Sequence, residues 1–104
     1  MDEEQRKKLY EKAIEYWGVP AQVMMVMEET GELLNALGKF NRDRATRDDV
    51  ITELADVSIL MEQMAVIFGL EDFKNEKEKK LERLKERLEN SYRLTKKKEQ
   101  SYYG

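Results

Sequence analysis

The chain contains no histidine and no cysteine, and its 104 residues include only one proline and five glycines. The absence of cysteine excludes disulfides, thiolate metal ligands and cysteine nucleophiles. The absence of histidine removes the imidazole ligands of zinc and copper sites and the usual general base near neutral pH. Any acid–base or metal chemistry therefore has to rest mainly on carboxylates.

Long hydrophobic runs are also missing. No stretch approaches the roughly 18 uninterrupted apolar residues of a membrane-spanning helix, and the charged N-terminus MDEEQRKK has no apolar segment like that of a signal peptide. We therefore expect a soluble, cytoplasmic protein that does not enter a membrane, which agrees with a chain free of cysteine.

What the chain has is charge and good helix formers. Charged residues make up 39% of it, and Glu, Lys, Leu and Met are common, which favours helices over sheets. We predict an all-α, four-helix bundle-like single domain over residues 1–95 and a frayed tail over 96–104. The four helices are expected over residues 3–17, 20–41, 46–69 and 72–94. A chain this short buries a small core, so a partner subunit would help.

Local signals mark the helix ends. Asp2 suits a cap for the first helix and Gly18 its end, while Pro20 suits the first turn of the second. Thr46 with Asp49 three residues later resembles a capping box for the third helix. The short polar link NRDRA, residues 41–45, predicts that the second and third helices are antiparallel neighbours.

The fourth predicted helix is basic. Residues 74–104 carry 11 Lys/Arg against 6 Asp/Glu, a net charge of +5. Because Glu residues are interleaved and no aromatic pattern accompanies them, we favour a solvated helix with Glu–Lys pairs over a nucleic-acid surface. Its narrow apolar stripe predicts packing at the edge of a bundle or against another chain, and consists of Phe73, Leu81, Leu84, Leu88 and Tyr92.

Acidic residues stand inside the two most apolar stretches, VMMVMEETGELLNAL and VITELADVSILM, and no lysine or arginine occurs between residues 13 and 38. At about 100° per residue, Glu29 lies mid-arc on the apolar face of its helix, with Glu32 about 60° away. Glu53 and Asp56 stand in the same relation on the next helix. Simple solvation of these acids is the alternative interpretation, but carboxylates brought together need a cation between them, and hard oxygen ligands select Mg²⁺, with Mn²⁺ as an alternative.

The spacing EETGE followed by ELAD resembles the EExxE…ExxD signature of the MazG-like, all-α nucleoside triphosphate pyrophosphohydrolases. The resemblance covers about residues 14–70 and is closest to short, single-domain bacterial and phage members. It implies hydrolysis of a nucleoside triphosphate to the monophosphate and pyrophosphate by a homodimer or homotetramer, with the clearing of non-standard nucleotides as one role that members of this kind have. The implied Mg²⁺ ligands and catalytic residues are Glu29, Glu32, Glu53 and Asp56, with Glu28 in a supporting position behind them or at a subunit contact.

Substrate-binding candidates flank the acids. Lys39 projects toward the side of Glu32, and Arg42, with Arg44 and Arg47 as further candidates, suits a phosphate contact. Gln22 shares an arc with Glu29 and would contact the base, as would Trp17 and Phe40. For Trp17 itself we favour core packing over base stacking.

The alternative function is a non-catalytic helical oligomerisation or regulatory module that binds nucleotide or a partner without turnover. Nucleic-acid binding through the fourth helix is the third and least favoured hypothesis. The sequence does not decide the base, the sugar, the phosphorus attacked, the number of metal ions or the glutamate that activates water.

Overall fold

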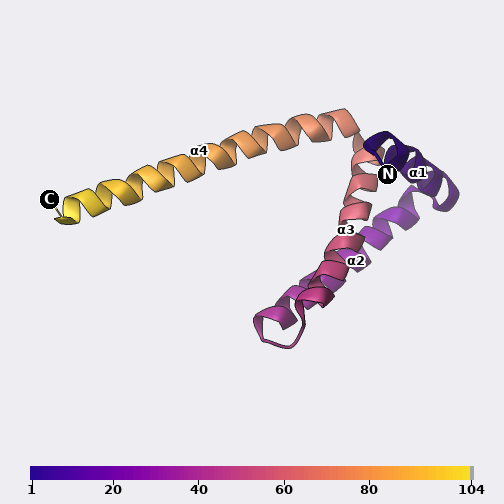
Figure 1. The fold of residues 1–104 in the computed structure, drawn as a ribbon. Helices are drawn as coiled ribbons and strands as arrows, with labels where there is room; N and C mark the ends of the chain where they lie inside the picture. The colour runs from indigo at the N-terminus through magenta and orange to yellow at the C-terminus, as the bar shows by residue number, and fades with distance from the viewer. Residues whose placement is uncertain (104) are drawn as a thin grey trace. The chain divides into compact units, whose positions relative to one another are not determined.

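The computed structural model describes residues 1–103, with side chains described through residue 98. This part of the chain is all helical and contains no strand (Figure 1). The helices are α1 (Glu3–Trp17), α2 (Val19–Asn41), α3 (Arg47–Phe68) and α4 (Leu70–Tyr103). The all-α prediction is confirmed, and within the described residues no helix combines the length and apolar character of a membrane span.

The predicted caps are present where helices begin. Asp2 and Gln5 form a capping box at the start of α1. At the start of α3 the Thr46 N–H donates to Asp49 Oδ2 at 2.8 Å, and the Asp49 N–H donates to Thr46 Oγ1 at 3.2 Å. Each box satisfies backbone donors that the first turn of a helix leaves without partners.

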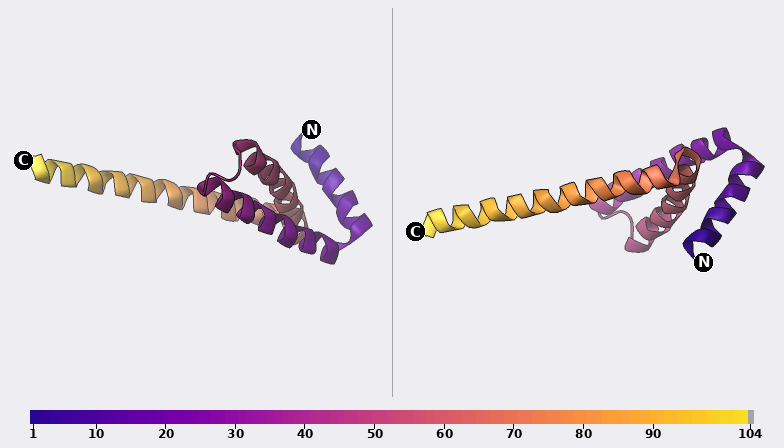
Figure 2. Two further views of the ribbon diagram at one scale, coloured as in Figure 1. Left: turned by 90° about the horizontal axis from the view of Figure 1, so that it is seen from below. Right: turned by 90° about the horizontal axis from the view of Figure 1, so that it is seen from above.

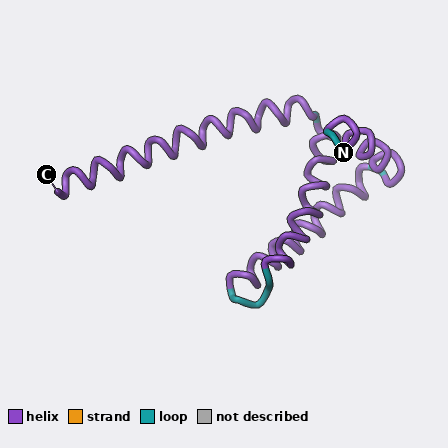
Figure 3. Tube along the Cα trace, in the orientation of Figure 1, coloured by secondary structure: helices purple, strands orange, loops and turns teal. Residues whose placement is uncertain are grey.

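Backbone conformations with positive φ separate the helices. Gly18 ends α1 with φ 89°, and Gly69 ends α3 with φ 130°, values that suit a residue without a side chain. In the turn between α2 and α3, Asp43 has φ 57°, which aspartate tolerates better than most residues. Figure 3 shows this turn as a short loop, so the two helices run antiparallel as predicted.

The chain divides into two compact units, Met1–Leu70 and the segment from Glu71 onward. In the first unit α2 and α3 make the most extensive contact, and α1 packs against both (Figure 2). The expectation that residues 1–95 form a single domain stays a prediction.

The core of the first unit is small. Its buried apolar residues are Tyr10, Leu60 and Ala65, and no side chain in the described part is less than 2% exposed. Many large apolar side chains on α2 and α3 face outward instead, among them Met24, Met27, Leu34, Leu37, Ile51, Leu54, Met61 and Phe68. A core of this size is marginal for an independent fold.

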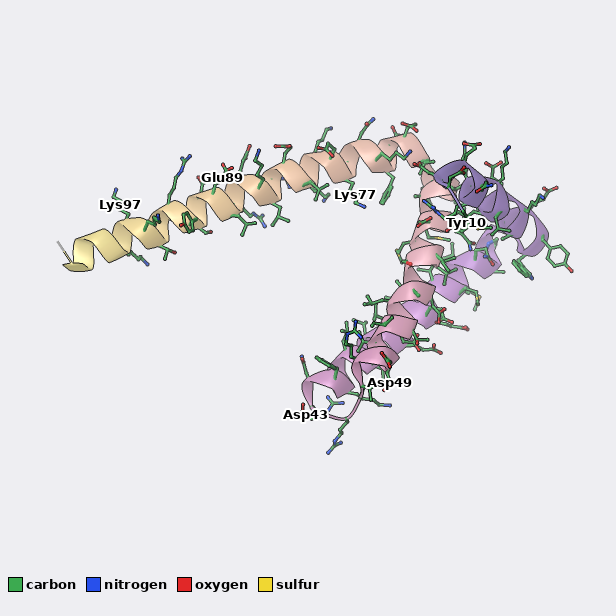
Figure 4. The ribbon with its side chains drawn as sticks, in the orientation of Figure 1. Tyr10, Asp43, Asp49, Lys77, Glu89 and Lys97 are labelled. Carbon is green, nitrogen blue, oxygen red and sulfur yellow. The ribbon has the colours of Figure 1, made fainter. Side chains whose placement is uncertain are left out.

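A polar contact joins α1 to α3. The Tyr10 hydroxyl donates to Glu62 Oε2 at 2.8 Å, and Arg6 Nε donates to the same oxygen at 3.1 Å. Burial and this carboxylate raise the pKa of Tyr10 to about 12, because both oppose ionisation of the phenol. Tyr10 is labelled in Figure 4 on α1.

The second unit consists of α4, which is longer than predicted. The sequence predicted a helix over 72–94 and a frayed tail from residue 96, but the helix begins at Leu70 and continues to Tyr103; Gly104 lies outside the described residues. The segment TKKKEQ contains neither Gly nor Pro and is rich in good helix formers, so nothing stops the helix there. The apolar stripe of α4 is exposed, and Lys77 and Lys96 lie over the rings of Phe73 and Tyr92 (Figure 4 labels Lys77).

Candidate functional site

Three of the predicted acids come together between α2 and α3. One carboxylate oxygen from each of Glu29, Glu53 and Asp56 lies within 4.8 Å of the other two. Glu29 comes from α2 and the other two come from successive turns of α3, so the antiparallel pairing of these helices brings the acids together. Glu29 and Glu53 are half-buried and Asp56 is exposed, which leaves the cluster open on one side.

Two oxygens of this carboxylate cluster are buried without a partner. Glu29 Oε2 and Glu53 Oε2 have no hydrogen bond to any group in the described part of the chain. A buried acceptor without a donor costs free energy, and the cost is larger for a charged group. The oxygen-only ligands, their separation and their missing partners all fit a hard divalent cation such as Mg²⁺.

The burial and mutual proximity of these acids raise the pKa values of two of them. Burial raises the pKa of Glu29 above its ordinary value, and Glu32, Asp56 and Glu53 add to the rise. Burial also raises the pKa of Glu53, with further contributions from the charges of Glu32 and Asp56. Each carboxyl therefore binds a proton more readily than a free glutamate does.

The other two predicted acids lie at the edge of the cluster. Glu32 acts on the pKa of both Glu29 and Glu53 but does not belong to the set of three that share the 4.8 Å limit. Glu28 is exposed and lines the adjoining pocket together with Glu29. The structure thus gathers three of the four predicted ligands and places the fourth beside them.

An apolar pocket of about 700 Å³ adjoins the cluster on one side. Glu29 and Asp56 form part of its wall, and Trp17, Met25, Ile59 and Leu60 are among its apolar lining residues. Trp17 is 61% exposed, so the preference for core packing of this residue is wrong within this chain. Its ring lies edge-on to Tyr16, with the centroids 5.4 Å apart, at the end of α1.

Two buried amides also line this apolar pocket. Gln22 from α2 is 5% exposed and Gln63 from α3 is 7% exposed, and Gln22 Nε2 donates to Gln63 Oε1 at 2.6 Å. The sequence analysis selected Gln22 but not Gln63. The available signal was that Gln63 follows Asp56 by about two helical turns and therefore lies on the same side of α3.

A second, polar pocket of about 420 Å³ lies on the other side of the cluster. Glu53 and Glu32 belong to its wall, and Lys39 and Arg44 supply positive charge. Arg42, the predicted phosphate contact, does not line it: its guanidinium lies within 4 Å of the Cβ position of Gly38. Asp49, labelled in Figure 4, also lines this pocket; its hydrogen bonds with Thr46 lower its pKa, and Lys39 contributes.

Comparisons of the chain with protein-family models, curated proteins and solved structures find no match.

Proposed function

We propose that this protein is a Mg²⁺-dependent nucleoside triphosphate pyrophosphohydrolase of the MazG-like type, releasing pyrophosphate and a nucleoside monophosphate. The single observation that carries the proposal is the carboxylate cluster of Glu29, Glu53 and Asp56, which contains two buried oxygens without partners. The resemblance of EETGE and ELAD to the family signature also supports it, because the acids of the signature include all three residues of the cluster.

Glu29, Glu53 and Asp56 would hold the metal ion, with Glu32 beside them. Bound there, Mg²⁺ would offset the charge of the phosphates and lower the pKa of a bound water. Mn²⁺ prefers the same oxygen ligands and is the alternative metal.

The two pockets suggest how a nucleotide would be oriented. The apolar pocket has the volume and the lining of a small-molecule site, and suits the nucleoside. Lys39 and Arg44 in the polar pocket would receive phosphate oxygens. The reacting phosphate would then lie at the carboxylates between the two pockets.

Activation of the attacking water would fall to the bound metal ion or to one of the glutamates, because the chain has no histidine. The reaction also requires that the water lie in line with the scissile bond. This requirement concerns the placement of the water and not the chemical nature of a particular side chain.

A homodimer or homotetramer is part of the proposal. The exposed apolar side chains of α2 and α3, together with the small core, support a second copy that covers them.

The proposal is tested with a panel of ribo- and deoxyribonucleoside triphosphates, Mg²⁺ or Mn²⁺, and detection of pyrophosphate. We expect release from at least one nucleotide, loss of release with EDTA, and a loss of 100-fold or more in Glu53→Gln. Glu15→Gln, an exposed position of α1, is the matched control and should retain activity.

Thermal unfolding separates the catalytic proposal from the non-catalytic alternative. Mg²⁺ at about 100 times its Kd stabilises a folded protein by about 2.7 kcal/mol, and Glu53→Gln should reduce that gain. Nucleotide that raises the Tm but stays intact across the whole panel favours a module that binds without turnover. No Mg²⁺ effect and no hydrolysis would overturn the proposal.

A further inference from the structure

Two polar side chains that line the apolar pocket have no part in the proposed reaction. They are the amides of Gln22 and Gln63. Each amide has two donor hydrogens and an acceptor oxygen, but the two side chains share a single hydrogen bond. Within the described residues no other hydrogen bond is made by either amide side chain. Gln22 Oε1 and Gln63 Nε2 are not among the buried atoms without a partner, so they remain accessible, and both residues line the pocket, where these groups are available to a ligand.

The pocket indicates what kind of partner this is. Gln22 Oε1 is left as an acceptor and Gln63 Nε2 as a donor, on two residues that line a pocket which Met25, Ile59 and Leu60 make apolar. A nucleobase has the complementary form, because it is flat and apolar on its faces and has neighbouring donors and acceptors along one edge. Trp17 on the same pocket supplies an aromatic surface for such a ring.

The hydrogen bond between the two amides can also run in the opposite direction. If both amides rotate by about 180°, Gln63 donates to Gln22, and the order of donor and acceptor offered to a ligand is exchanged. The pair can therefore match base edges of either order without leaving a buried group unpaired.

Building on the proposed function, we propose that the Gln22–Gln63 pair recognises the nucleobase edge and makes the site tolerant of different bases. The pair distinguishes nucleotides from inorganic polyphosphates, and it favours no single base strongly. The ligand class is thus nucleotides with either purine or pyrimidine bases.

Trp17 is the only tryptophan of the chain and lines the same pocket, so its fluorescence reports occupancy without any need for turnover. We expect the four deoxynucleoside monophosphates to quench it with Kd values within tenfold of one another. Deoxyribose 5-phosphate, which lacks a base, should bind at least tenfold more weakly. Equal binding of the base-free probe, or a preference above 100-fold for one base, would overturn the proposal.

Substitutions separate recognition from a structural role. Gln22→Met or Gln63→Met leaves one buried amide alone and should lower both the Tm and nucleotide affinity, the latter tenfold or more. In the double variant Gln22→Met/Gln63→Met no amide is left unpaired, so the Tm should recover while nucleotide affinity stays low. If affinity recovers with the Tm, the pair is structural and the proposal fails. Met61→Leu, outside the pocket on α3, is the control.

The proposed function and this proposal fail in different ways. Quenching by monophosphates that is lost in the double variant, with no triphosphate hydrolysed, keeps the recognition role and rejects the enzyme. Hydrolysis of triphosphates with the same KM in the double variant as in the natural chain rejects the recognition role alone. Tripolyphosphate, which has no base, should be hydrolysed equally by both proteins.

Discussion

Glu29 and Glu53 are acids whose ionisation is opposed, because burial and neighbouring acids raise both pKa values above 4.5. A carboxyl whose folded-state pKa is raised contributes stability below its unfolded pKa, and this contribution is lost as the pH rises through the folded pKa. Without Mg²⁺, Glu29→Gln should therefore become more stable relative to the natural chain as the pH rises from below 4.5 to 7. Thermal melts at matched pH values measure the difference.

Mg²⁺ provides the control for that experiment. At pH 7 the addition of Mg²⁺ should stabilise the natural chain more than the Glu29→Gln variant. The stability advantage of the variant should therefore shrink or change sign. A difference between the two proteins that does not change with pH would contradict the raised pKa.

Tyr10 is the other residue with a testable environment. Tyr10→Phe removes the hydroxyl that donates to Glu62 and should cost about 1 kcal/mol in the free energy of unfolding, measured by urea titration at pH 7. With a folded pKa of about 12 against an ordinary 10.0, the phenol contributes stability below pH 10 that is lost as the pH rises through 12. The Phe variant should lack this loss. Tyr16→Phe, at an 82% exposed position, should change neither quantity.

Some site residues could be predicted and others could not. Helical periodicity placed Glu29, Glu53 and Asp56 correctly, because the angle between side chains on a helix depends only on their spacing. Periodicity did not show that Trp17 lines a pocket, because a pocket is formed by residues from several helices and periodicity describes only one helix at a time. Gln63 was missed although its spacing from Asp56 places both on one side of α3, because that spacing does not show that Gln22 lies opposite as its partner.

At the scale of the elements, the start of α3 matters most for the site, because it sets where Glu53 lies. Thr46→Ala removes the side-chain half of the capping box and should cost about 1 kcal/mol in stability, measured by thermal or urea unfolding. Thr95→Ala, at an exposed position within α4 where no cap is lost, is a matched control and should cost less. An equal effect of the two substitutions would argue against the cap.

The ends of three helices were predictable because each carries its own chemical signal: Asp2, Gly18, Thr46 and Gly69. The C-terminal end of α4 was not, because after Leu94 the apolar stripe stops while the helix continues on Lys, Glu and Gln. Periodicity identifies the part of a helix that has an apolar face, and a helix of charged residues can extend beyond it.

At the scale of the whole molecule, we expect the exposed apolar side chains of α2 and α3 to be covered by a second copy. Leu34 is 65% exposed, and Leu34→Glu should cost little in a monomer, because both residues favour helix, but should disrupt an assembly that buries it. Sedimentation velocity should give a multiple of the monomer mass for the natural chain and a smaller mass for the variant.

Leu94→Glu makes the same change at a position that is 61% exposed on α4, outside the α2 and α3 faces, and should leave the mass unchanged. A monomeric natural chain, or an unaffected mass in Leu34→Glu, would contradict the assembly. The number of subunits could not be predicted from the sequence, because apolar exposure indicates that a surface is covered without specifying the symmetry.

The short turn between α2 and α3 has a kinetic consequence. Because all three clustered acids belong to one hairpin with a short turn, we expect that closing the hairpin brings like charges together early in folding, before α1 packs. Refolding without divalent ions should accordingly accelerate when the pH is lowered, and magnesium present at the start should have the same effect. If the proposed magnesium site is correct, the bound ion would therefore speed the folding of the hairpin that carries the three acids.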